Sequence, residues 1–202
     1  MRLIEHSVPV EPVAAREKLE QLIKLSKETK IFIGYNFIQQ SVIQSVVHAF
    51  KYYDMPRLAF AAGEVLGTAA LTHLGDFDLL LPVPLHRTRL ADRTYNQSER
   101  LAAGISNVWK VPVARPTLVR RKKPTKTQTS LSESERWENV RDAFVLSRTA
   151  TLELQDKRVV IIDDVLTTGA TIASIASLLQ DAGITSIHIM TLSCPPDLDD
   201  LT

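Results

Sequence analysis

The fold is decided by one stretch of sequence, Val159-Val160-Ile161-Ile162-Asp163-Asp164-Val165-Leu166-Thr167-Thr168-Gly169-Ala170-Thr171. Its first four residues are apolar and β-branched, which predicts a buried strand. Two carboxylates follow at the end of this strand. A Thr/Gly loop follows, and after it apolar residues recur at helical spacing until Gly183, at Ile172, Ile175, Ala176, Leu179 and Ala182. The stretch therefore predicts a strand, a turn and a helix in succession.

The turn between that strand and that helix has the chemistry of a phosphate site. The first turn of a helix leaves backbone N–H groups unpaired and carries the positive end of the helix dipole, so it stabilises an anion. Thr167, Thr168 and Thr171 add hydroxyl donors. Gly169 lets the backbone approach a phosphate without a Cβ in the way.

The two carboxylates, Asp163 and Asp164, stand at the carboxyl end of the predicted strand, where open parallel sheets bind ligands. Carboxylates accept hydrogen bonds from ribose hydroxyls and also suit a hydrated magnesium ion. A sugar beside a phosphate indicates a ribose 5-phosphate. The alternative is an ordinary strand-turn-helix unit with two solvated acids. The chain contains no Gly-x4-Gly-Lys-Ser/Thr motif of a Walker-type NTPase.

This run of thirteen residues resembles the motif with which type I phosphoribosyltransferases bind 5-phosphoribosyl 1-pyrophosphate (PRPP). The resemblance implies that Asp163 and Asp164 are the catalytic residues, which hold the ribose hydroxyls, and that they hold Mg²⁺ indirectly, through water. It also implies that the 5-phosphate binds at a loop comprising Leu166, Thr167, Thr168, Gly169, Ala170 and Thr171.

Composition restricts the class of protein. The chain has 202 residues, 45% of them hydrophobic and 23% charged, which is typical of a globular α/β domain. A net charge of +1 provides no global attraction to nucleic acid. The single cysteine, Cys194, excludes an internal disulfide and a multi-cysteine zinc site within this sequence.

The N-terminal residues lack the apolar core of a signal peptide, and the longest charge-free span, 31–50, is too polar for a membrane helix. We therefore expect a cytoplasmic protein with no membrane insertion.

An arginine-rich loop is expected after a second strand at Phe77–Leu81, because Pro82 and Pro84 limit ladder pairing there. Arginines at the carboxyl end of a strand can bind a second anionic group, for which pyrophosphate is the candidate. The predicted contacts are Pro84, Leu85, His86, Arg87 and Arg93. A solvated basic loop is the alternative.

A second basic segment packs five cations into residues 120–126. Its functional interpretations are a flexible loop that closes over pyrophosphate and a nucleic-acid contact. The candidate loop residues are Arg121, Lys122, Lys123 and Gln128. Residues 133–139 are predicted to form a helix after this segment.

The remaining elements alternate. Amphipathic helices are predicted over 35–53 and 58–74, and strands over 143–146, 159–162 and 187–192. Such alternation predicts an α/β fold, a mostly parallel sheet flanked by helices. We expect residues 1–34 to be an N-terminal extension and residues 35–202 to be a phosphoribosyltransferase-like domain whose segment 35–75 is a helical hood.

Beyond the PRPP motif, the chain resembles the ComF family of phosphoribosyltransferase-like proteins linked with competence for DNA uptake. The similar segments are Val47-His48-Ala49-Phe50-Lys51-Tyr52, Pro82-Val83-Pro84-Leu85, Arg93-Thr94-Tyr95-Asn96-Gln97, and Thr125 to Gln128 with Leu131, Arg136, Asn139 and Phe144. Two departures stand out: the chain lacks the N-terminal four-cysteine zinc ribbon, and Thr94 stands where the family usually has glycine. A threonine at a turn that needs positive φ would be strained.

The resemblance implies a phosphoribosyltransferase that uses PRPP and Mg²⁺, releases pyrophosphate and acts on an unknown acceptor. Two other hypotheses stay open: a PRPP sensor that transfers nothing, and a DNA-uptake accessory that contacts single-stranded DNA or DNA-uptake proteins. A homodimer stays open as well.

Overall fold

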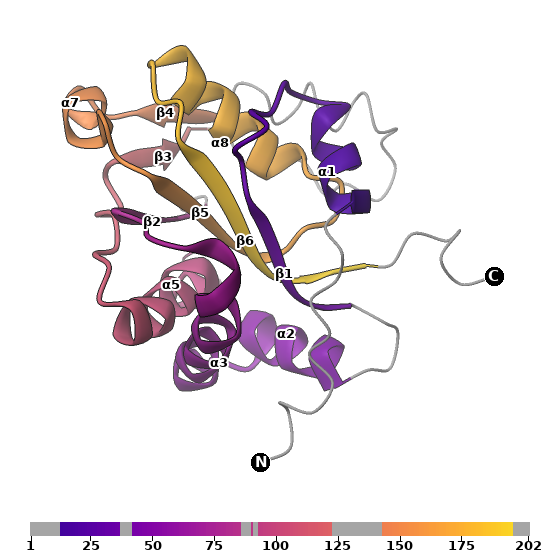
Figure 1. Cartoon of the computed structure of the whole chain (residues 1–202). Helices are drawn as coiled ribbons and strands as arrows, with labels where there is room; N and C mark the ends of the chain where they lie inside the picture. The colour runs from indigo at the N-terminus through magenta and orange to yellow at the C-terminus, as the bar shows by residue number, and fades with distance from the viewer. Residues whose placement is uncertain (1–12, 37–41, 86–89, 91–92, 123–142, 196–202) are drawn as a thin grey trace.

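In the described part of the chain, four parallel strands form the central sheet in the order β1-β6-β5-β2 (Figure 1). They are β1 (Ile31–Asn36), β2 (Leu79–Pro82), β5 (Val159–Val165) and β6 (Ile187–Cys194). The structure is a computed structural model that describes residues 13–36, 42–85, 90, 93–122 and 143–195. The apolar start of β5 is buried on both faces because it lies between β2 and β6 at the centre of the sheet.

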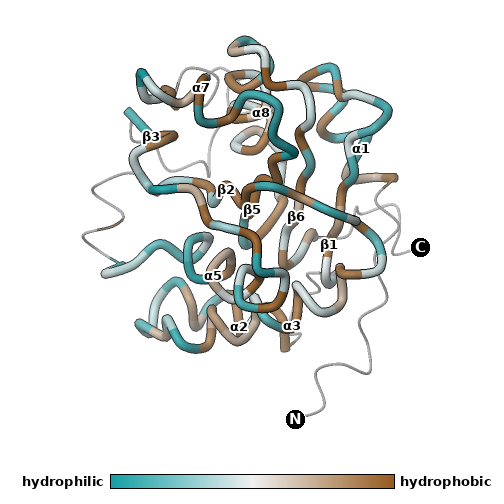
Figure 2. Tube along the Cα trace, turned by 60° about the vertical axis from the view of Figure 1, so that its left-hand side comes forward, coloured by the Kyte–Doolittle hydropathy of each residue, from teal (hydrophilic) through white to brown (hydrophobic). Residues whose placement is uncertain are grey.

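Helices cover both faces of the sheet (Figure 1). Helices α8 (Ala170–Asp181) and α1 (Val13–Glu20) lie on one face, where they share a core with Val159 and Ile161 of β5. Helices α2 (Val42–Tyr52), α3 (Pro56–Leu74) and α5 (Gln97–Trp109) lie on the other, with Val160 and Ile162. The tube in Figure 2 shows the apolar central strands between helices of alternating polarity. The predicted parallel sheet flanked by helices is confirmed.

Helices α3 and α5 approach each other closely through glycines. A Cβ on Gly63 would lie 2.2 Å from the carbonyl oxygen of Leu101, and a Cβ on Gly104 would lie 2.1 Å from that of Phe60. Both distances are far below van der Waals contact, so only glycine allows the two backbones to pack this tightly. The close contact fixes α5, whose first turn faces the carboxyl end of β5 through Ser98 and Asp163.

The strand predicted over 143–146 does not belong to the parallel sheet. It forms β4 (Phe144–Leu146), which pairs antiparallel with β3 (Val119–Arg121) in a separate two-stranded sheet. The Arg121 guanidinium lies over the Phe144 ring, 5.2 Å from its centroid, and this contact adds to the pairing. A short helix, α7 (Ala150–Leu154), then leads to β5.

The N-terminal part of the chain differs from the expectation in detail. The helix expected from Tyr35 begins at Val42, because Ile31–Asn36 pairs with β6 as an edge strand of the main sheet. Strand β1 thus crosses the boundary expected between residues 34 and 35. Helices α2 and α3 form the N-terminal helical region that the sequence predicts. The helix predicted over 133–139 lies outside the described residues.

Candidate functional site

Asp163 and Asp164 lie near the carboxyl end of β5, at the carboxyl edge of the sheet. The Asp163 Oδ1 atom accepts two hydrogen bonds, one from the Ser98 hydroxyl at 2.9 Å and one from the Asp164 backbone N–H at 2.9 Å. These contacts fix the orientation of the carboxyl group. Burial, followed by the charge of Asp164, raises the pKa of Asp163 to about 7. A carboxyl poised near neutrality is typical of a functional site.

The second carboxylate has a cation of its own. The Lys51 Nζ atom, in the last turn of α2, lies 3.1 Å from the Asp164 Oδ2 atom. The Asp164 side chain is 13% exposed and that of Lys51 25%, so water screens this ion pair less than it screens a surface pair.

The predicted phosphate loop has the expected turn. Gly169 precedes α8 with φ of 75°, a left-handed conformation that disfavours any side chain. A Cβ at this position would also lie 2.9 Å from the Leu19 side chain of α1. The backbone N–H groups of the first helical turn therefore follow directly on the carboxyl end of β5, as anion binding requires.

The loop before α5 is held by its own side chains. The Asn96 side chain caps α5, since its Oδ1 atom accepts from the Ser98 backbone N–H at 3.0 Å and its Nδ2 atom donates to the Val83 carbonyl at 3.0 Å. Arg93 donates to Gln97 at 3.3 Å. Thr94 has φ of 63°, so this position does require the conformation that glycine adopts freely.

These elements enclose a cavity of about 230 Å³. Its wall combines the two carboxylates with hydroxyl groups from the phosphate loop and with cations from three separate elements. The residues are Lys51, Val83, Leu85, Arg93, Gln97, Ser98, Arg121, Asp163, Asp164, Val165, Thr167 and Thr171.

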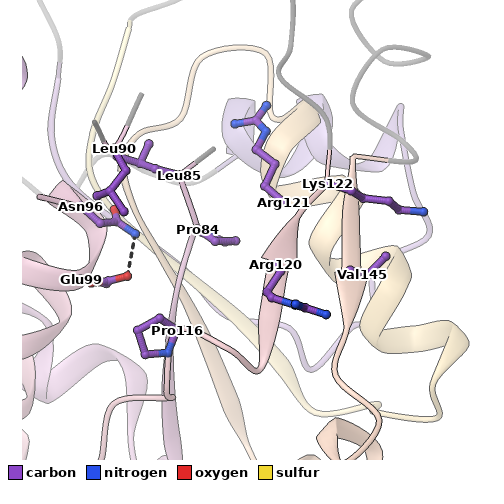
Figure 3. Close-up of a pocket in the computed structure, with 10 residues that line it drawn as sticks. All are labelled: Pro84, Leu85, Leu90, Asn96, Glu99, Pro116, Arg120, Arg121, Lys122 and Val145. Atoms are coloured by element: carbon purple, nitrogen blue, oxygen red, sulfur yellow. Dashed lines mark hydrogen bonds between the residues drawn. The ribbon is translucent and has the colours of Figure 1, made fainter. Parts of the chain in front are cut away.

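A second cavity, of about 460 Å³, shares Leu85 and Arg121 with the first. Figure 3 shows Pro84 between two groups of side chains, with Leu90, Asn96 and Glu99 on one side and the cations of β3 on the other. The Asn96 Nδ2 atom donates to the Glu99 Oε1 atom at 3.2 Å. The two cavities lie next to each other because Arg121 lines both.

The structure therefore brings together part of the predicted site. The side chains of Thr167, Thr171, Leu85, Arg93 and Arg121 line the cavity of the two carboxylates. Pro84 and Lys122 line the second cavity. Four predicted residues line neither. Leu166 and Ala170 are buried in the core, the Thr168 hydroxyl lies 3.5 Å from the Ala170 backbone N–H, and Gly169 forms the left-handed turn before α8. Four others, His86, Arg87, Lys123 and Gln128, lie outside the described residues.

Sequence reasoning assigned no role to two residues that contact the carboxylates, Lys51 and Ser98. Lys51 stands inside one of the segments that resemble the ComF family, and Ser98 directly follows another. Their proximity to the carboxylates depends on tertiary packing, so spacing along the chain does not reveal it.

The residues fit a magnesium ion only in a limited way. Among the described residues, no three His, Cys, Asp or Glu side chains gather as a metal site. Asp163 already accepts two hydrogen bonds, and Asp164 is paired with Lys51. Such a pair suits a hydrated ion that is held mainly by the phosphate oxygens of a ligand.

Within the described part of the chain, no helix combines the length and the apolar character needed to cross a bilayer.

Residues 96–197 match the phosphoribosyl transferase domain family. Competence protein F of Haemophilus influenzae is 35% identical over 116 residues, which cover 57% of this chain and 50% of that protein. DNA utilization protein YhgH of Escherichia coli (strain K12) is 33% identical over 155 residues, which cover 74% and 66%. The chain thus spans half to two thirds of the length of these curated relatives.

Two solved structures resemble the chain loosely. One is a hypoxanthine phosphoribosyltransferase from Staphylococcus aureus, with a TM-score of 0.43, 18% identity and coverage of 79% of this chain and 74% of that one. The other is the adenine phosphoribosyltransferase of Leishmania tarentolae, with a TM-score of 0.45, 11% identity and coverage of 86% and 94%. On the family match and the curated relatives, the chain belongs to the phosphoribosyl transferase domain family, and its sequence relatives are of the ComF type.

Proposed function

We propose that this protein binds PRPP and transfers its phosphoribosyl group to an acceptor, with release of pyrophosphate. One observation supports the proposal most directly: a single cavity combines the hydroxyl groups of Thr167 and Thr171, the two carboxylates and cations from separate elements. These three kinds of group match the 5-phosphate, the ribose hydroxyls and the pyrophosphate of PRPP.

In the proposed reaction, the bond from the anomeric carbon to pyrophosphate breaks and a bond from that carbon to the acceptor nucleophile forms. The positive charge that develops on the ribose ring calls for positioned charge more than for a nucleophilic side chain. Asp163 and Asp164 would accept hydrogen bonds from the ribose hydroxyls, and Arg93 with Arg121 would bind the departing pyrophosphate. A bound magnesium ion would supply further neutralisation of pyrophosphate.

The test is calorimetric titration of purified protein with PRPP, with and without magnesium. The Asp164→Asn variant keeps the shape of the side chain but loses its charge, so we expect its affinity to fall by about tenfold or more. Asp181→Asn is the matched control, because Asp181 is an exposed carboxylate at the end of α8. A folded wild-type protein that does not bind PRPP would refute the proposal, and so would equal affinities in the two variants.

Catalysis is tested separately from binding. Pyrophosphate release should be measured over a panel of nucleobases and amines. Release with one of them would establish transfer and identify the acceptor class. PRPP binding without release over the whole panel would favour the alternative that the protein senses PRPP.

A second candidate function is the handling of single-stranded DNA. It rests on the names of the relatives, which concern competence and DNA utilisation, and on the three successive cations Arg120, Arg121 and Lys122 at the end of β3. Binding through phosphates should weaken steeply with salt. Binding of an oligonucleotide that does not respond to salt, or no binding at all, would rule out this function.

A further inference from the structure

Asp164 is paired within the protein itself. Its Oδ2 atom lies 3.1 Å from the Lys51 ammonium, and Lys51 lines the same cavity as Arg93, Arg121 and Thr171. The pair sits at the position where a ligand and its metal would meet the second carboxylate. A charge-assisted contact this short, with little exposed surface, is stronger than an ordinary surface pair.

The position of Lys51 is fixed by neighbours outside its own helix. The carbonyl oxygen of the preceding residue, Phe50, accepts hydrogen bonds from the Tyr95 hydroxyl at 2.8 Å and from the Gln97 side chain at 3.2 Å. This carbonyl lies in the last turn of α2, where helical carbonyls lack intrahelical partners. The Phe50 side chain is 1% exposed and anchors the same turn in the core. Tyr95 and Gln97 therefore hold the end of α2 against the site.

Two further features support the position of the Lys51 ammonium at this end of α2. The carboxyl end of a helix carries the negative end of its dipole, and Lys51 is the basic residue of that turn. Burial, followed by the charge of Asp54, raises the pKa of Tyr95, so its hydroxyl group remains a hydrogen-bond donor near neutral pH. Lys51 is thus held in place by contacts within the protein itself.

A divalent ion that bound Asp164 directly would have to displace this ammonium or lie beside it. Lying beside it is unfavourable, since like charges a few ångströms apart repel strongly at a partly buried site. The described residues also offer the ion no cluster of three carboxylate, imidazole or thiolate ligands. We propose that the Lys51 ammonium takes the place of a divalent ion at Asp164, so that magnesium is required only at the phosphate groups of the ligand. This inference rests on the proposed PRPP-binding function.

The first test compares PRPP binding by calorimetry in magnesium and in EDTA. In the wild type, we expect magnesium to improve affinity moderately, through the pyrophosphate. In Lys51→Met, the benefit of magnesium should be at least about tenfold larger, because the ion can now neutralise Asp164. Lys51→Arg keeps the charge, and Lys27→Met removes an exposed charge elsewhere. The benefit of magnesium in both variants should be as small as in the wild type. An equal magnesium benefit in the wild type and in Lys51→Met would overturn the inference.

The second test needs no PRPP and so separates this inference from the proposed function. Thermal unfolding is followed with and without millimolar Mg²⁺ or Mn²⁺. Lys51→Met should gain stability from the divalent ion, whereas the wild type and the double variant with Asp164→Asn should not. A wild-type protein that fails to bind PRPP would overturn the proposed function and leave this test decisive for Lys51. Absence of a divalent-ion response in Lys51→Met would overturn the role of Lys51.

Discussion

At the scale of single residues, the buried Asp163 carboxyl makes the stability of the protein depend on pH. The pKa of Asp163 is about 7 in the folded protein, whereas an ordinary Asp carboxyl has a pKa of about 4. Between these two pH values, the folded protein holds a proton that the unfolded chain has released. The free energy of unfolding therefore falls as pH rises from about 4 to about 7. Above neutral pH the folded protein carries the whole cost of the buried charge, which a ligand would offset.

Asp163→Asn tests this assignment. The amide oxygen can still accept from Ser98 and from the Asp164 backbone, but the charge is gone. We expect the variant to be more stable than the wild type above pH 7, by up to a few kcal/mol, and the difference to vanish near pH 4. Urea unfolding at several pH values measures it. A difference that does not change with pH would contradict the raised pKa.

Thr94 is a strained residue at the edge of the site. Its φ of 63° is unfavourable for a β-branched side chain, and its hydroxyl donates to the Asp54 carboxylate at 2.5 Å. Thr94→Gly removes the strain, but it also removes one exposed hydrogen bond and increases the conformational entropy of the unfolded chain. We expect a net gain of about 1 kcal/mol in the free energy of unfolding.

Thr94→Ala provides the comparison, because alanine keeps the unfavourable φ and loses the hydrogen bond. It should be less stable than the wild type in the same urea titration. If Thr94→Gly proved no more stable than Thr94→Ala, the backbone at this position would not be strained.

At the scale of elements, α3 and α5 pack against each other through glycines that differ in how closely the facing helix approaches them. A Cβ on Gly104 would lie 2.1 Å from the Phe60 carbonyl oxygen, and backbone cannot move aside as a flexible side chain can. We expect Gly104→Ala to destabilise the protein by about 3 kcal/mol as the helices separate. Urea unfolding followed by circular dichroism would measure this loss.

Gly67→Ala is the matched substitution on the facing helix. Its Cβ would lie 3.2 Å from the Ile105 Cα atom, a contact that a small shift relieves. The higher helix propensity of alanine, worth about 1 kcal/mol, should offset the crowding. Equal losses in the two variants would show that the closeness of the backbone contact does not decide the outcome.

The elements also show how far sequence patterns reach. The run of β5, its loop and α8 was predictable because each part is encoded by adjacent residues: a β-branched run, a glycine with φ of 75° and apolar residues at helical spacing. Strand β1 was missed because its pattern is interrupted by Gly34, which lies where a Cβ would come within 2.9 Å of the Leu192 carbonyl oxygen. The pairing of β4 with β3 depends on a partner outside its own segment.

The same distinction applies to the site. Thr167, Thr171 and both carboxylates belong to one continuous motif, and the sequence predicted them together. Lys51 and Ser98 reach the carboxylates only because α2 and α5 pack beside the end of β5. Nothing in the local sequence of α2 indicates that the Lys51 ammonium is turned towards Asp164.

At the scale of the whole molecule, the site exists only in the folded chain. Its cavity is lined from α2, from the loop before α5, from β3 and from the end of β5 with the loop that follows. The unfolded chain separates these groups and should have no affinity for PRPP. Binding must then add directly to the free energy of unfolding.

PRPP at a hundredfold excess over its dissociation constant should therefore raise the free energy of unfolding by about 2.7 kcal/mol. Because the ligand acts on the native state alone, the urea midpoint should rise while the dependence of free energy on urea stays unchanged. Gly169→Ala should show little of this shift, since a Cβ at a φ of 75° disturbs the phosphate loop. A shift of the same size in Gly169→Ala at the same PRPP concentration would place the ligand away from the start of α8.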